Sequence, residues 1–283
     1  MTWFAETLHR SVRQTLAVKR PIATVKTAFQ QMQILDTEAY GRALVLDGVV
    51  QTTERDEHIY HEMMTHVPLI AHPNPRRVLI IGGGDGGIAR EVLRHPTVEA
   101  VTMVEIDPHV IEACRRHLPS ICGRAFHDRR LHVVVDDGAK FVRTTDERFD
   151  VAIVDSPDPI GPATVLFAME FYRNVARVLR GPGIMVRQTG SVFLQPNEIV
   201  AADRRLRRVF TYVAPYVAAI PTYIGGFFGF LLASNRVQPL RAAPAQLEAR
   251  YRRARLACQY YTTAIHRACF ALPASVRALL VPV

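Results

Sequence analysis

The stretch Val78-Leu-Ile-Ile-Gly-Gly-Gly-Asp-Gly-Gly87 constrains the fold more than any other part of the chain. Its four aliphatic residues are typical of a buried parallel strand, and the glycines after them permit a tight turn into a helix. Gly82, Gly84 and Gly87 fit the G-x-G-x-x-G pattern, and Glu105 lies about 20 residues further on, at the end of a second apolar run. This order of strand, turn, helix, strand and acid predicts a nucleotide-binding α/β unit.

Asp85, inside the glycine loop, changes the kind of ligand that the loop predicts. In a dinucleotide site the loop and the helix N-terminus hold an anionic pyrophosphate, which a carboxylate would repel by roughly 4 kcal/mol at ~4 Å in an effective dielectric of ~20. Glu105 suits a ribose, because two vicinal hydroxyls can donate to one carboxylate. A nucleoside with a cationic tail is therefore predicted, either S-adenosylmethionine or its decarboxylated form. Asp85 as a cap of the following helix is the alternative, and both roles are compatible.

Length and composition predict a globular protein with one large and one small domain. The 283 residues can bury roughly 75% of their unfolded surface. The hydrophobic share of 49% excludes a disordered chain. The net charge of +9 would suit a polyanion, but much of it lies at 203–208 and 250–255, in helical patterns with an apolar opposite face. We interpret these runs as solvated helix faces and expect no nucleic acid partner.

Metal, membrane and export signals are incomplete in this sequence. His61, Glu62 and His66 resemble a zinc-binding helix, but H-E-x-x-x-H places the second histidine one residue too far to share an ion, so we expect no metal. The uncharged stretch 212–235 is broken by prolines and glycines, so we predict sheet core there, and no membrane span. The four cysteines have no C-x-x-C or zinc spacing, and no signal peptide is evident, so we expect a reduced, cytoplasmic protein.

The first 56 residues predict a small antiparallel β-domain. Residues 22–53 have a strand-like pattern, and Asp47-Gly48 between apolar runs is typical of a type I′ hairpin turn. Residues 1–17 carry a poor signal, and we expect an irregular arm or a short helix there. A helix over 54–70 and a proline-rich breaker then lead into the glycine-loop strand. We therefore divide the chain into an N-terminal β-domain, 1–56, and a Rossmann-like catalytic domain, 57–283.

The rest of the chain alternates strands and helices, which predicts a doubly wound, mostly parallel sheet. Strands are expected at 131–135, 150–154 and 183–188, and helices at 108–117, 138–145 and 168–180. In such sheets ligands bind at the carboxyl ends of the strands. The acidic residues expected there are Asp85, Glu105, Asp137, Asp155 and Asp158. Each alone could be a turn or cap residue, but together they predict one acidic site, which would repel nucleic acid.

Several stretches resemble the spermidine synthases, also called polyamine aminopropyltransferases. The resemblance covers nearly the whole chain, and the matches occur in the right order. They are Leu46-Asp-Gly-Val-Val-Gln-Thr-Thr-Glu-Arg-Asp-Glu57, Tyr60-His-Glu-Met63, Gly82-Gly-Gly-Asp-Gly-Gly87, Val104-Glu-Ile-Asp107, Asp136-Asp-Gly138, Asp155-Ser-Pro-Asp-Pro-Ile-Gly-Pro162 and Pro221-Thr-Tyr-Ile-Gly-Gly226. So many ordered matches make chance a poor explanation.

The resemblance implies an α/β fold: a doubly wound, methyltransferase-type core with a small N-terminal antiparallel β-domain. It implies transfer of an aminopropyl group from decarboxylated S-adenosylmethionine, as a co-substrate, to putrescine. The products would be spermidine and methylthioadenosine, and no permanently bound cofactor is implied. Members of the family are usually dimers or tetramers, so a homodimer or homotetramer is expected.

The resemblance also implies roles for individual residues. Asp155 would be the catalytic acid/base, and Tyr60 and Tyr223 would orient the attacking amine. The residues implied to bind the donor or methylthioadenosine are Gln30, Asp85, Glu105, Asp137, Gly138 and Pro162. Those implied to contact the polyamine are His61, Asp85, Asp155 and Asp158. Residues 157–169 would form a loop that closes over the site. For the two tyrosines, core packing is the alternative.

Two departures from the family pattern and two rival functions stay open. Many members have Gln-Gly-Glu-Ser where this chain has Gln188-Thr-Gly-Ser191, so a glutamate near the acceptor is absent. Pro157 replaces the usual Ser, Thr or Cys and restricts Ser156 to extended geometry.

The length of the acceptor amine is not fixed, and cadaverine, agmatine and spermidine stay open beside putrescine. The rivals are methyl transfer from intact S-adenosylmethionine and non-catalytic binding of polyamine or nucleic acid.

Overall fold

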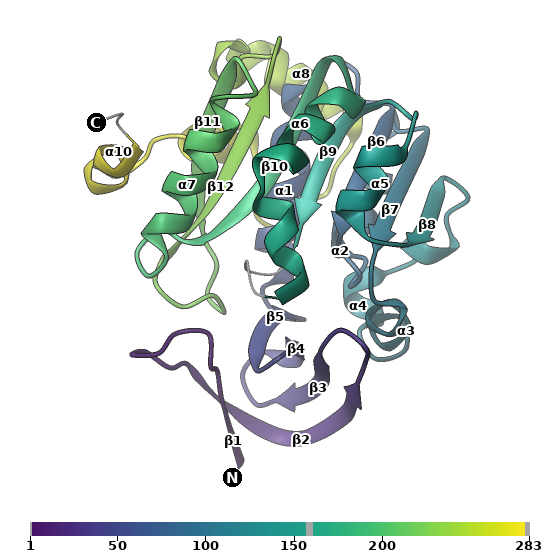
Figure 1. Cartoon of the computed structure of the whole chain (residues 1–283), viewed down its shortest axis with the longest axis vertical. Helices are drawn as coiled ribbons and strands as arrows, with labels where there is room; N and C mark the ends of the chain where they lie inside the picture. Colours follow the sequence, from purple (N-terminus) through teal and green to yellow (C-terminus); the bar gives the residue numbers. More distant parts are fainter. Residues whose placement is uncertain (1, 157–160, 281–283) are drawn as a thin grey trace.

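The computed structural model describes residues 2–156 and 161–280, with the backbone alone at 161–163, and contains two sheets (Figure 1). The smaller sheet is antiparallel and has the strand order β1–β2–β3–β4–β5. Its strands are β1 (Thr2–Ala5), β2 (Thr15–Lys26), β3 (Gln31–Thr37), β4 (Gly41–Leu46) and β5 (Val49–Thr53). In Figure 1 this sheet lies below the larger sheet, against one end of its strands.

The larger sheet has seven strands in the order β11–β12–β10–β9–β6–β7–β8. They are β6 (Arg77–Gly82), β7 (Ala100–Glu105), β8 (Leu131–Val135), β9 (Phe149–Asp155), β10 (Leu179–Ser191), β11 (Tyr212–Ala219) and β12 (Phe227–Ser234). The pairs from β10 to β8 are parallel, and β12 joins β10 and β11 antiparallel. The predicted doubly wound, mostly parallel sheet is confirmed.

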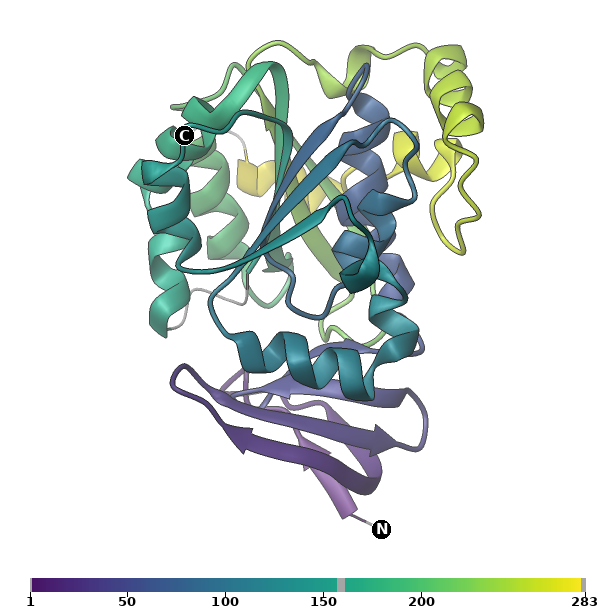
Figure 2. The same ribbon diagram turned by 90° about the vertical axis from the view of Figure 1, so that its right-hand side faces the viewer.

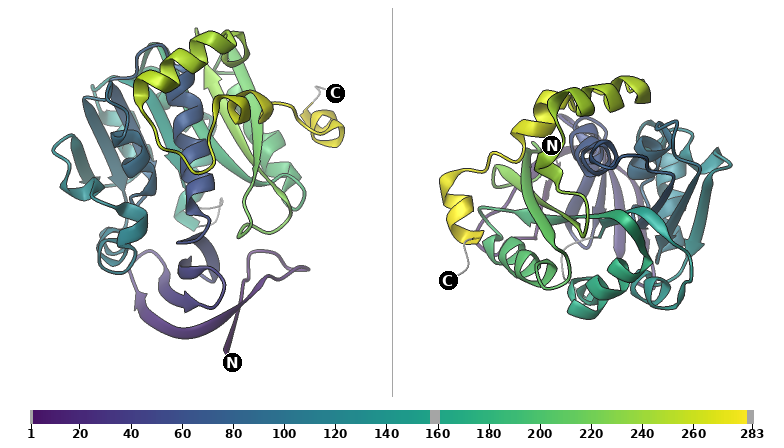
Figure 3. Two further views of the ribbon diagram at one scale, coloured as in Figure 1. Left: turned by 180° about the vertical axis from the view of Figure 1, so that it is seen from behind. Right: turned by 90° about the horizontal axis from the view of Figure 1, so that it is seen from above.

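Helices cover both faces of the larger sheet (Figures 1 and 3). One face carries α1 (Glu57–Ala71), α2 (Gly87–Leu93) and α8 (Pro244–Ala254), and the other carries α5 (Gly138–Thr144), α6 (Met169–Val178) and α7 (Pro196–Leu206). Two helices, α3 (Pro108–His117) and α4 (Pro119–Cys122), lie between the two sheets (Figure 2). The remaining helices are η1 (Ala125–His127), η2 (Gly161–Phe167), η3 (Pro239–Arg241), α9 (Thr263–Ala268) and α10 (Ala274–Leu280).

Strand β6 shows why an unbroken apolar run suits the centre of this sheet. Val78 and Ile80 pack into the core beneath α1 and α2, whereas Leu79 and Ile81 pack into the core on the opposite face. All four side chains are buried. Because both faces of β6 are covered, alternation with polar residues would place polar groups in one core or the other. The strand therefore carries its glycine loop to a fixed position.

Helix α3 joins the small sheet to the large one. Val110, Cys114 and Leu118 form one apolar cluster with Met32 and Leu44 from the small sheet. The cluster buries apolar surface that neither part could bury alone. The small sheet is thereby held over the carboxyl ends of β6 and β7, where the acidic residues were expected.

Most predicted elements are confirmed to within a few residues, including strands at 131–135, helices at 108–117 and sheet core within 212–235. The hairpin at Asp47-Gly48 is also confirmed: the φ angles of +47° and +79° are left-handed, as a type I′ turn requires. The prediction of an irregular arm or short helix over 1–17 is wrong at 2–5 and 15–17, where β1 pairs antiparallel with β2, and is confirmed for the irregular segment 6–14 between them. Trp3 in β1 is 58% exposed, so this edge strand has no buried face for a periodic pattern to reveal.

Among the described residues, no helix combines the length and hydrophobicity that a membrane span needs. The same residues contain no group of three or more His, Cys, Asp or Glu side chains placed to hold a metal ion. His61 and His66 belong to different hydrogen-bonded networks: His61 contacts Glu57 and Asp85, and His66 contacts Glu91 and His95. The arginine runs of α7 and α8 are largely solvent-exposed, as predicted.

Replacing Gly82 by alanine should destabilise the fold more than the same change at Gly226. Both glycines have left-handed φ angles, +81° and +88°, which cost a residue with a Cβ about 1–2 kcal/mol. A Cβ at Gly82 would also collide with the Asp155 backbone carbonyl, whereas a Cβ at Gly226 meets open space. We expect Gly82→Ala to lose about 1–3 kcal/mol more than Gly226→Ala in urea unfolding followed by circular dichroism. Equal losses would contradict the packing of β6 against β9.

Candidate active site

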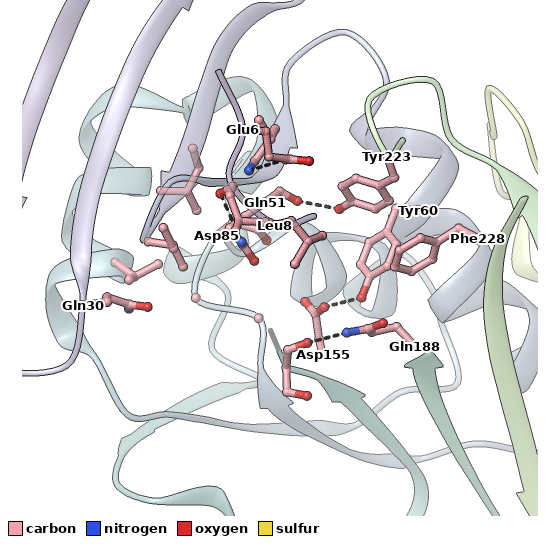
Figure 4. Close-up of a pocket in the computed structure, with 18 of the residues that line it drawn as sticks. Glu6, Leu8, Gln30, Gln51, Tyr60, Asp85, Asp155, Gln188, Tyr223 and Phe228 are labelled. Carbon is pink, nitrogen blue, oxygen red and sulfur yellow. Dashed lines mark hydrogen bonds between the residues drawn. The ribbon is translucent and has the colours of Figure 1, made fainter. Parts of the chain in front are cut away.

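Two adjoining cavities lie between the small sheet and the carboxyl ends of β6, β7 and β9. The tyrosine cavity, about 160 Å³, is lined by Tyr60, Asp85, Asp155, Gln188 and Tyr223 among others (Figure 4). The apolar cavity, about 270 Å³, is lined chiefly by aliphatic side chains such as Leu46, Val104 and Leu166, with Asp137 and Gly138 at one wall. Gln30, Gln51, Glu105 and Ser156 line both cavities. The two spaces therefore form one elongated site with different chemistry at each end.

The glycine loop places Asp85 in the tyrosine cavity and at the start of α2. Gly82, Gly83 and Gly86 have left-handed φ angles, which allow the chain to turn sharply after β6. The Asp85 Oδ1 atom accepts the Gly87 N–H group at 2.7 Å, which is the first N–H of α2, but the N-cap residue is Gly86, so Asp85 supports the start of the helix without being its N-cap. The same carboxylate lines the cavity, so this backbone contact and ligand binding are compatible.

A buried chain of charges stands behind Asp85. Arg90 donates to both oxygens of Glu57 at 2.9 Å, Glu57 accepts from His61 Nδ1 at 2.5 Å, and His61 Nε2 lies 3.2 Å from Asp85 Oδ2. Burial lowers the pKa of His61, but Asp85 and Glu57 outweigh it and raise that pKa to about 10. Burial opposes ionisation of Asp85, yet His61 and the Gly87 N–H hold the pKa of Asp85 below its usual range. At neutral pH the chain is a buried imidazolium between two carboxylates.

His61 does not line either cavity and is only 1% exposed. Its two ring nitrogens are occupied by Glu57 and Asp85. In this structure His61 is therefore not placed for the direct polyamine contact that the resemblance implied. His61 lies behind Asp85 and reaches the cavity through that carboxylate.

Asp155, at the end of β9, lines the tyrosine cavity beside Tyr60 (Figure 4). Tyr60 donates its hydroxyl to Asp155 Oδ1 at 2.5 Å, and the Tyr60 and Tyr223 rings meet edge to face with centroids 5.7 Å apart. Tyr223 in turn donates to the backbone carbonyl of Gln51 at 2.5 Å. Burial and the nearby Asp85 carboxylate raise the pKa of Asp155 to about 6. Burial and Asp155 also raise the pKa of Tyr60 well above its ordinary value, so its hydroxyl stays a donor.

Glu105, at the end of β7, lies where the two cavities meet. Its Oε1 atom accepts the Asp107 N–H group at 2.9 Å, and burial raises the pKa of the carboxyl to about 7. Gln30, from the small sheet, donates to Asp107 Oδ2 at 3.0 Å. Asp107 thus holds the Gln30 amide of the small sheet with its side chain and the Glu105 carboxylate of the large sheet with its backbone N–H. An acid of this kind, held by backbone, suits the recognition of neutral hydroxyl groups.

The remaining predicted residues lie at the apolar cavity or outside the described part of the chain. Asp137 caps α5 by accepting the Ala139 N–H at 2.7 Å, and Gly138 packs closely against Ile81. Both line the apolar cavity. Asp158 lies outside the described residues, and so does the side chain of Pro162. The predicted closing loop over 157–169 falls partly outside them as well.

Sequence reasoning missed several residues of the tyrosine cavity. Glu6, Leu8 and His9 line it from the segment between β1 and β2, and Gln195 lines it from the segment before α7. Glu6 is buried, and its Oε2 atom accepts the Val50 N–H at 2.9 Å. No local pattern distinguishes these residues: the pairing of β1 with β2 brings the N-terminal ones to the site, and Gln195 reaches it from the connection between β10 and α7. Gln188 begins the stretch Gln188-Thr-Gly-Ser191, which departs from the family pattern. Its side chain lines the tyrosine cavity and donates to the Ser156 carbonyl at 2.9 Å.

The fold and the site together define an α/β protein with a doubly wound core, a small antiparallel sheet and an acidic cavity at the ends of the core strands. Family descriptions match the chain in two consecutive parts: "Spermine/spermidine synthase domain" at 57–241 and "Spermidine synthase tetramerisation domain" at 2–54. The chain belongs to the spermine/spermidine synthase family. The predicted resemblance is thereby confirmed.

Named relatives and solved structures agree with this assignment. A polyamine aminopropyltransferase of Erwinia tasmaniensis is 51% identical over 271 residues, which are 96% of this chain and 95% of that protein. One from Pectobacterium carotovorum is 49% identical, over 96% of this chain and 94% of its own length. A spermidine synthase crystallised with the transition state analogue AdoDATO has a TM-score of 0.94 and 36% identity, covering 99% of this chain and 94% of that one. Spermidine synthase from Thermotoga maritima has a TM-score of 0.93, with the same identity and coverage.

The buried Glu105 should destabilise the ligand-free protein at high pH. With a pKa near 7 in the fold and near 4.5 when exposed, the folded state binds more protons between these values, so stability falls as the pH rises through that window. Glu105→Gln should therefore be more stable than wild type by up to ~3 kcal/mol near pH 8, and by almost nothing near pH 4. Denaturant unfolding at several pH values measures this difference.

The exposed Glu99, which pairs with Arg76, provides a control for the Glu105 experiment. Glu99→Gln should change stability by less than about 1 kcal/mol at every pH. A Glu105→Gln difference that does not grow between about pH 5 and pH 8 would show that Glu105 is not the buried acid described above.

Proposed function

We propose that the protein transfers the aminopropyl group of decarboxylated S-adenosylmethionine to putrescine, giving spermidine and methylthioadenosine. The observation that carries the proposal is the tyrosine cavity, in which the buried carboxylates Asp85 and Asp155 face one space beside the apolar cavity. The acidic end of the site suits the sulfonium and ammonium groups of the donor and the amino groups of the acceptor. The apolar end suits the adenine of the donor. The names of the relatives support the same activity.

In this proposal the donor spans both cavities. The adenine occupies the apolar cavity beside Asp137, Gly138 and, by the family resemblance, Pro162. Glu105 accepts hydrogen bonds from the ribose hydroxyls, with Gln30 close by on Asp107. The ammonium of the aminopropyl arm lies against Asp85. The carboxylate of intact S-adenosylmethionine would meet Asp85 instead, which favours the decarboxylated donor.

The acceptor amine is proposed to lie between Tyr60 and Tyr223, against Asp155. The far ammonium of a diamine then needs a negative partner to replace the glutamate missing from Gln188-Thr-Gly-Ser191. Glu6 is a carboxylate at that cavity and supplies one. Asp158 keeps its implied polyamine contact, and His61 acts through Asp85 rather than directly. Putrescine is the default acceptor, with cadaverine, agmatine and spermidine as the alternatives to be assayed.

The reaction needs alignment and one proton transfer. The neutral amine nitrogen attacks the methylene carbon next to sulfur, a C–N bond forms, and the C–S bond breaks with its electrons going to the sulfonium. Alignment can contribute up to ~7–11 kcal/mol. Deprotonating an amine with a pKa near 10.4 at pH 7 costs roughly 4–5 kcal/mol. Asp155 takes this proton, and a pKa of about 6 makes it a stronger base than an ordinary aspartate.

The nearby sulfonium assists the proton transfer by lowering the pKa of the amine. The tyrosines and the closing loop would exclude water, which strengthens these electrostatic interactions. Tyr60 donates to the same carboxylate and so fixes which oxygen faces the amine. No cofactor is required by this scheme.

The proposal extends to assembly and location. We propose a division into residues 1–56, which form the small sheet, and 57–283, which form the catalytic unit. The name of the family description that matches 2–54 supports a homodimer or homotetramer. A cytoplasmic location fits the four cysteines, none of which forms a disulfide among the described residues.

The function is tested by incubating the protein with decarboxylated S-adenosylmethionine and each candidate amine, then identifying products by mass. We expect spermidine and methylthioadenosine from putrescine. Methylated amine formed from intact S-adenosylmethionine would favour the methyltransferase instead. Retention on heparin without methylthioadenosine release would favour the non-catalytic binder.

Asp155→Asn should lower turnover at least about 100-fold, because the amide cannot accept the proton. Methylthioadenosine should still bind within about threefold of wild type, since Asp155 lies at the acceptor end of the site. Steady-state kinetics and calorimetry measure the two quantities. Asp146→Asn, at an exposed position away from the site, serves as a control. Near-normal turnover by Asp155→Asn would overturn its role as the base.

A further inference from the structure

A buried carboxylate outside the two cavities ties together the elements that carry the two tyrosines. Asp56 lies between β5 and α1, and its side chain is only 5% exposed. Asp56 Oδ1 accepts the Thr53 hydroxyl at 2.6 Å, and Oδ2 accepts the Thr222 N–H at 2.7 Å together with the Thr222 hydroxyl. Thr53 and Thr222 are themselves buried. We call this group of three residues the Asp56 clasp.

The clasp is close in sequence to both tyrosines. Tyr60 lies one helical turn after Asp56 on α1, and Tyr223 directly follows Thr222 in the connection between β11 and β12. Figure 4 shows the two tyrosines side by side at the cavity wall. The spacing of their rings therefore depends on how the β11–β12 connection is attached to the start of α1. Asp56 supplies that attachment with both of its oxygens.

The N-terminal segment is attached to the same point. Gln14 Nε2 donates to the Thr222 carbonyl at 2.9 Å. Gln14 follows the segment that contributes Leu8 and His9 to the tyrosine cavity, and its own carbonyl accepts the Glu6 N–H at 2.9 Å. Three separate parts of the chain thus meet at Thr222, and each of them contributes to the same wall of the cavity.

The β11–β12 connection would have considerable freedom without this attachment. Gly225 and Gly226 both have left-handed φ angles, and a Cβ at Gly226 would meet open space. Two consecutive glycines allow many backbone conformations. The Thr222 N–H and hydroxyl bonds to Asp56 limit those conformations at the residue next to Tyr223. The buried carboxylate in turn needs these donors, because an unsatisfied buried charge is costly.

We propose that Asp56 is a positioning residue for the acceptor amine: through Thr222 it fixes Tyr223 against Tyr60 and so sets the geometry of the acceptor end. This inference rests on the proposed aminopropyl transfer. Asp56 does not touch either cavity, so its effect passes through the tyrosine wall. Among the described residues, the hydrogen bonds of Asp56, Thr53 and Thr222 reach no residue of β6, β7 or α5, which carry Glu105, Asp137 and Gly138 at the donor end. Loss of the clasp should therefore affect the acceptor and spare the donor.

The test compares Asp56→Ala with Asp150→Ala. Asp150 is buried to the same degree, at 5%, and accepts the Arg76 and Arg77 N–H groups at 2.8 Å, but it lies at the opposite end of β9 from Asp155. Both variants lose a buried carboxylate that accepts hydrogen bonds from backbone. Asp56→Ala should raise the KM for putrescine at least about tenfold, since a misplacement of about 1 Å can cost ~10²-fold. The dissociation constant of Asp56→Ala for methylthioadenosine should stay within about twofold of wild type. For Asp150→Ala, both this dissociation constant and the KM for putrescine should stay within about twofold of wild type.

Two variants at Thr222 keep the test decisive if Asp56→Ala does not fold. Thr222→Val removes the hydroxyl at nearly constant volume and should raise the KM for putrescine at least about threefold. Thr222→Ser keeps the hydroxyl and should restore a value within about twofold of wild type. A KM that is unchanged in Asp56→Ala and Thr222→Val, or raised equally in Asp150→Ala, would overturn the proposal.

Hydrogen exchange separates this inference from the proposed function. In the ligand-free protein, amides at 222–228 should exchange at least about tenfold faster in Asp56→Ala than in wild type, and those of the glycine loop should not. If wild type forms no product with any amine, the aminopropyl transfer fails while the exchange result still reports on the clasp. Unchanged exchange at 222–228 in Asp56→Ala would overturn the clasp even in an active enzyme.

Discussion

The site depends on negative charge that the fold buries at the ends of three neighbouring strands. β6, β7 and β9 are adjacent and parallel, so Asp85, Glu105 and Asp155 must converge on one edge of the sheet. Asp85 is balanced by His61, but burial leaves the pKa of Glu105 near 7 and that of Asp155 near 6. A ligand that brings positive charge and hydroxyl donors relieves this electrostatic cost, and an anionic ligand increases it.

The two sheets have different parts in this arrangement. The large sheet supplies the carboxylates. Glu105 and Asp155 lie at the ends of the parallel strands β7 and β9, and Asp85 lies in the glycine loop that follows β6. The small sheet covers the edge with Leu46, Val49 and Gln51, and it keeps the site narrow enough for burial to act on the acids. Helix α3 and the Asp56 clasp each connect the small sheet to the rest of the chain, the first by apolar packing and the second by hydrogen bonds. The perturbed pKa values thus follow from the packing of two separate sheets.

Much of this arrangement could be predicted from sequence. The apolar run of β6, the glycine loop and the acid after β7 are local patterns whose geometry is nearly fixed, so the core sheet and its acidic edge followed from them. The turn at Asp47-Gly48 was equally local. The position of Asp85 beside α2 was also local, since its carboxylate contacts the N–H group only two residues further on.

Other features depend on contacts between residues far apart in the chain. β1 is an exposed edge strand, so its sequence has no periodic pattern, and Glu6 reaches the cavity only because β1 pairs with β2. His61 directly follows Tyr60 in a stretch that resembles the family's site. Its hydrogen bond to Glu57 nevertheless holds it behind Asp85. Asp56 reads as an ordinary residue before a helix, and its contact with Thr222 joins residues 166 positions apart. The effect of burial on Asp155 and Glu105 likewise required the position of the small sheet.

The central claim is that this acidic cavity selects an adenosine derivative with a cationic tail. Isothermal titration calorimetry of wild type and Asp85→Asn with decarboxylated and with intact S-adenosylmethionine tests it most directly. The account predicts that wild type binds the decarboxylated form at least about tenfold more tightly and that Asp85→Asn loses most of this preference. Equal or tighter binding of the intact form by wild type would contradict it.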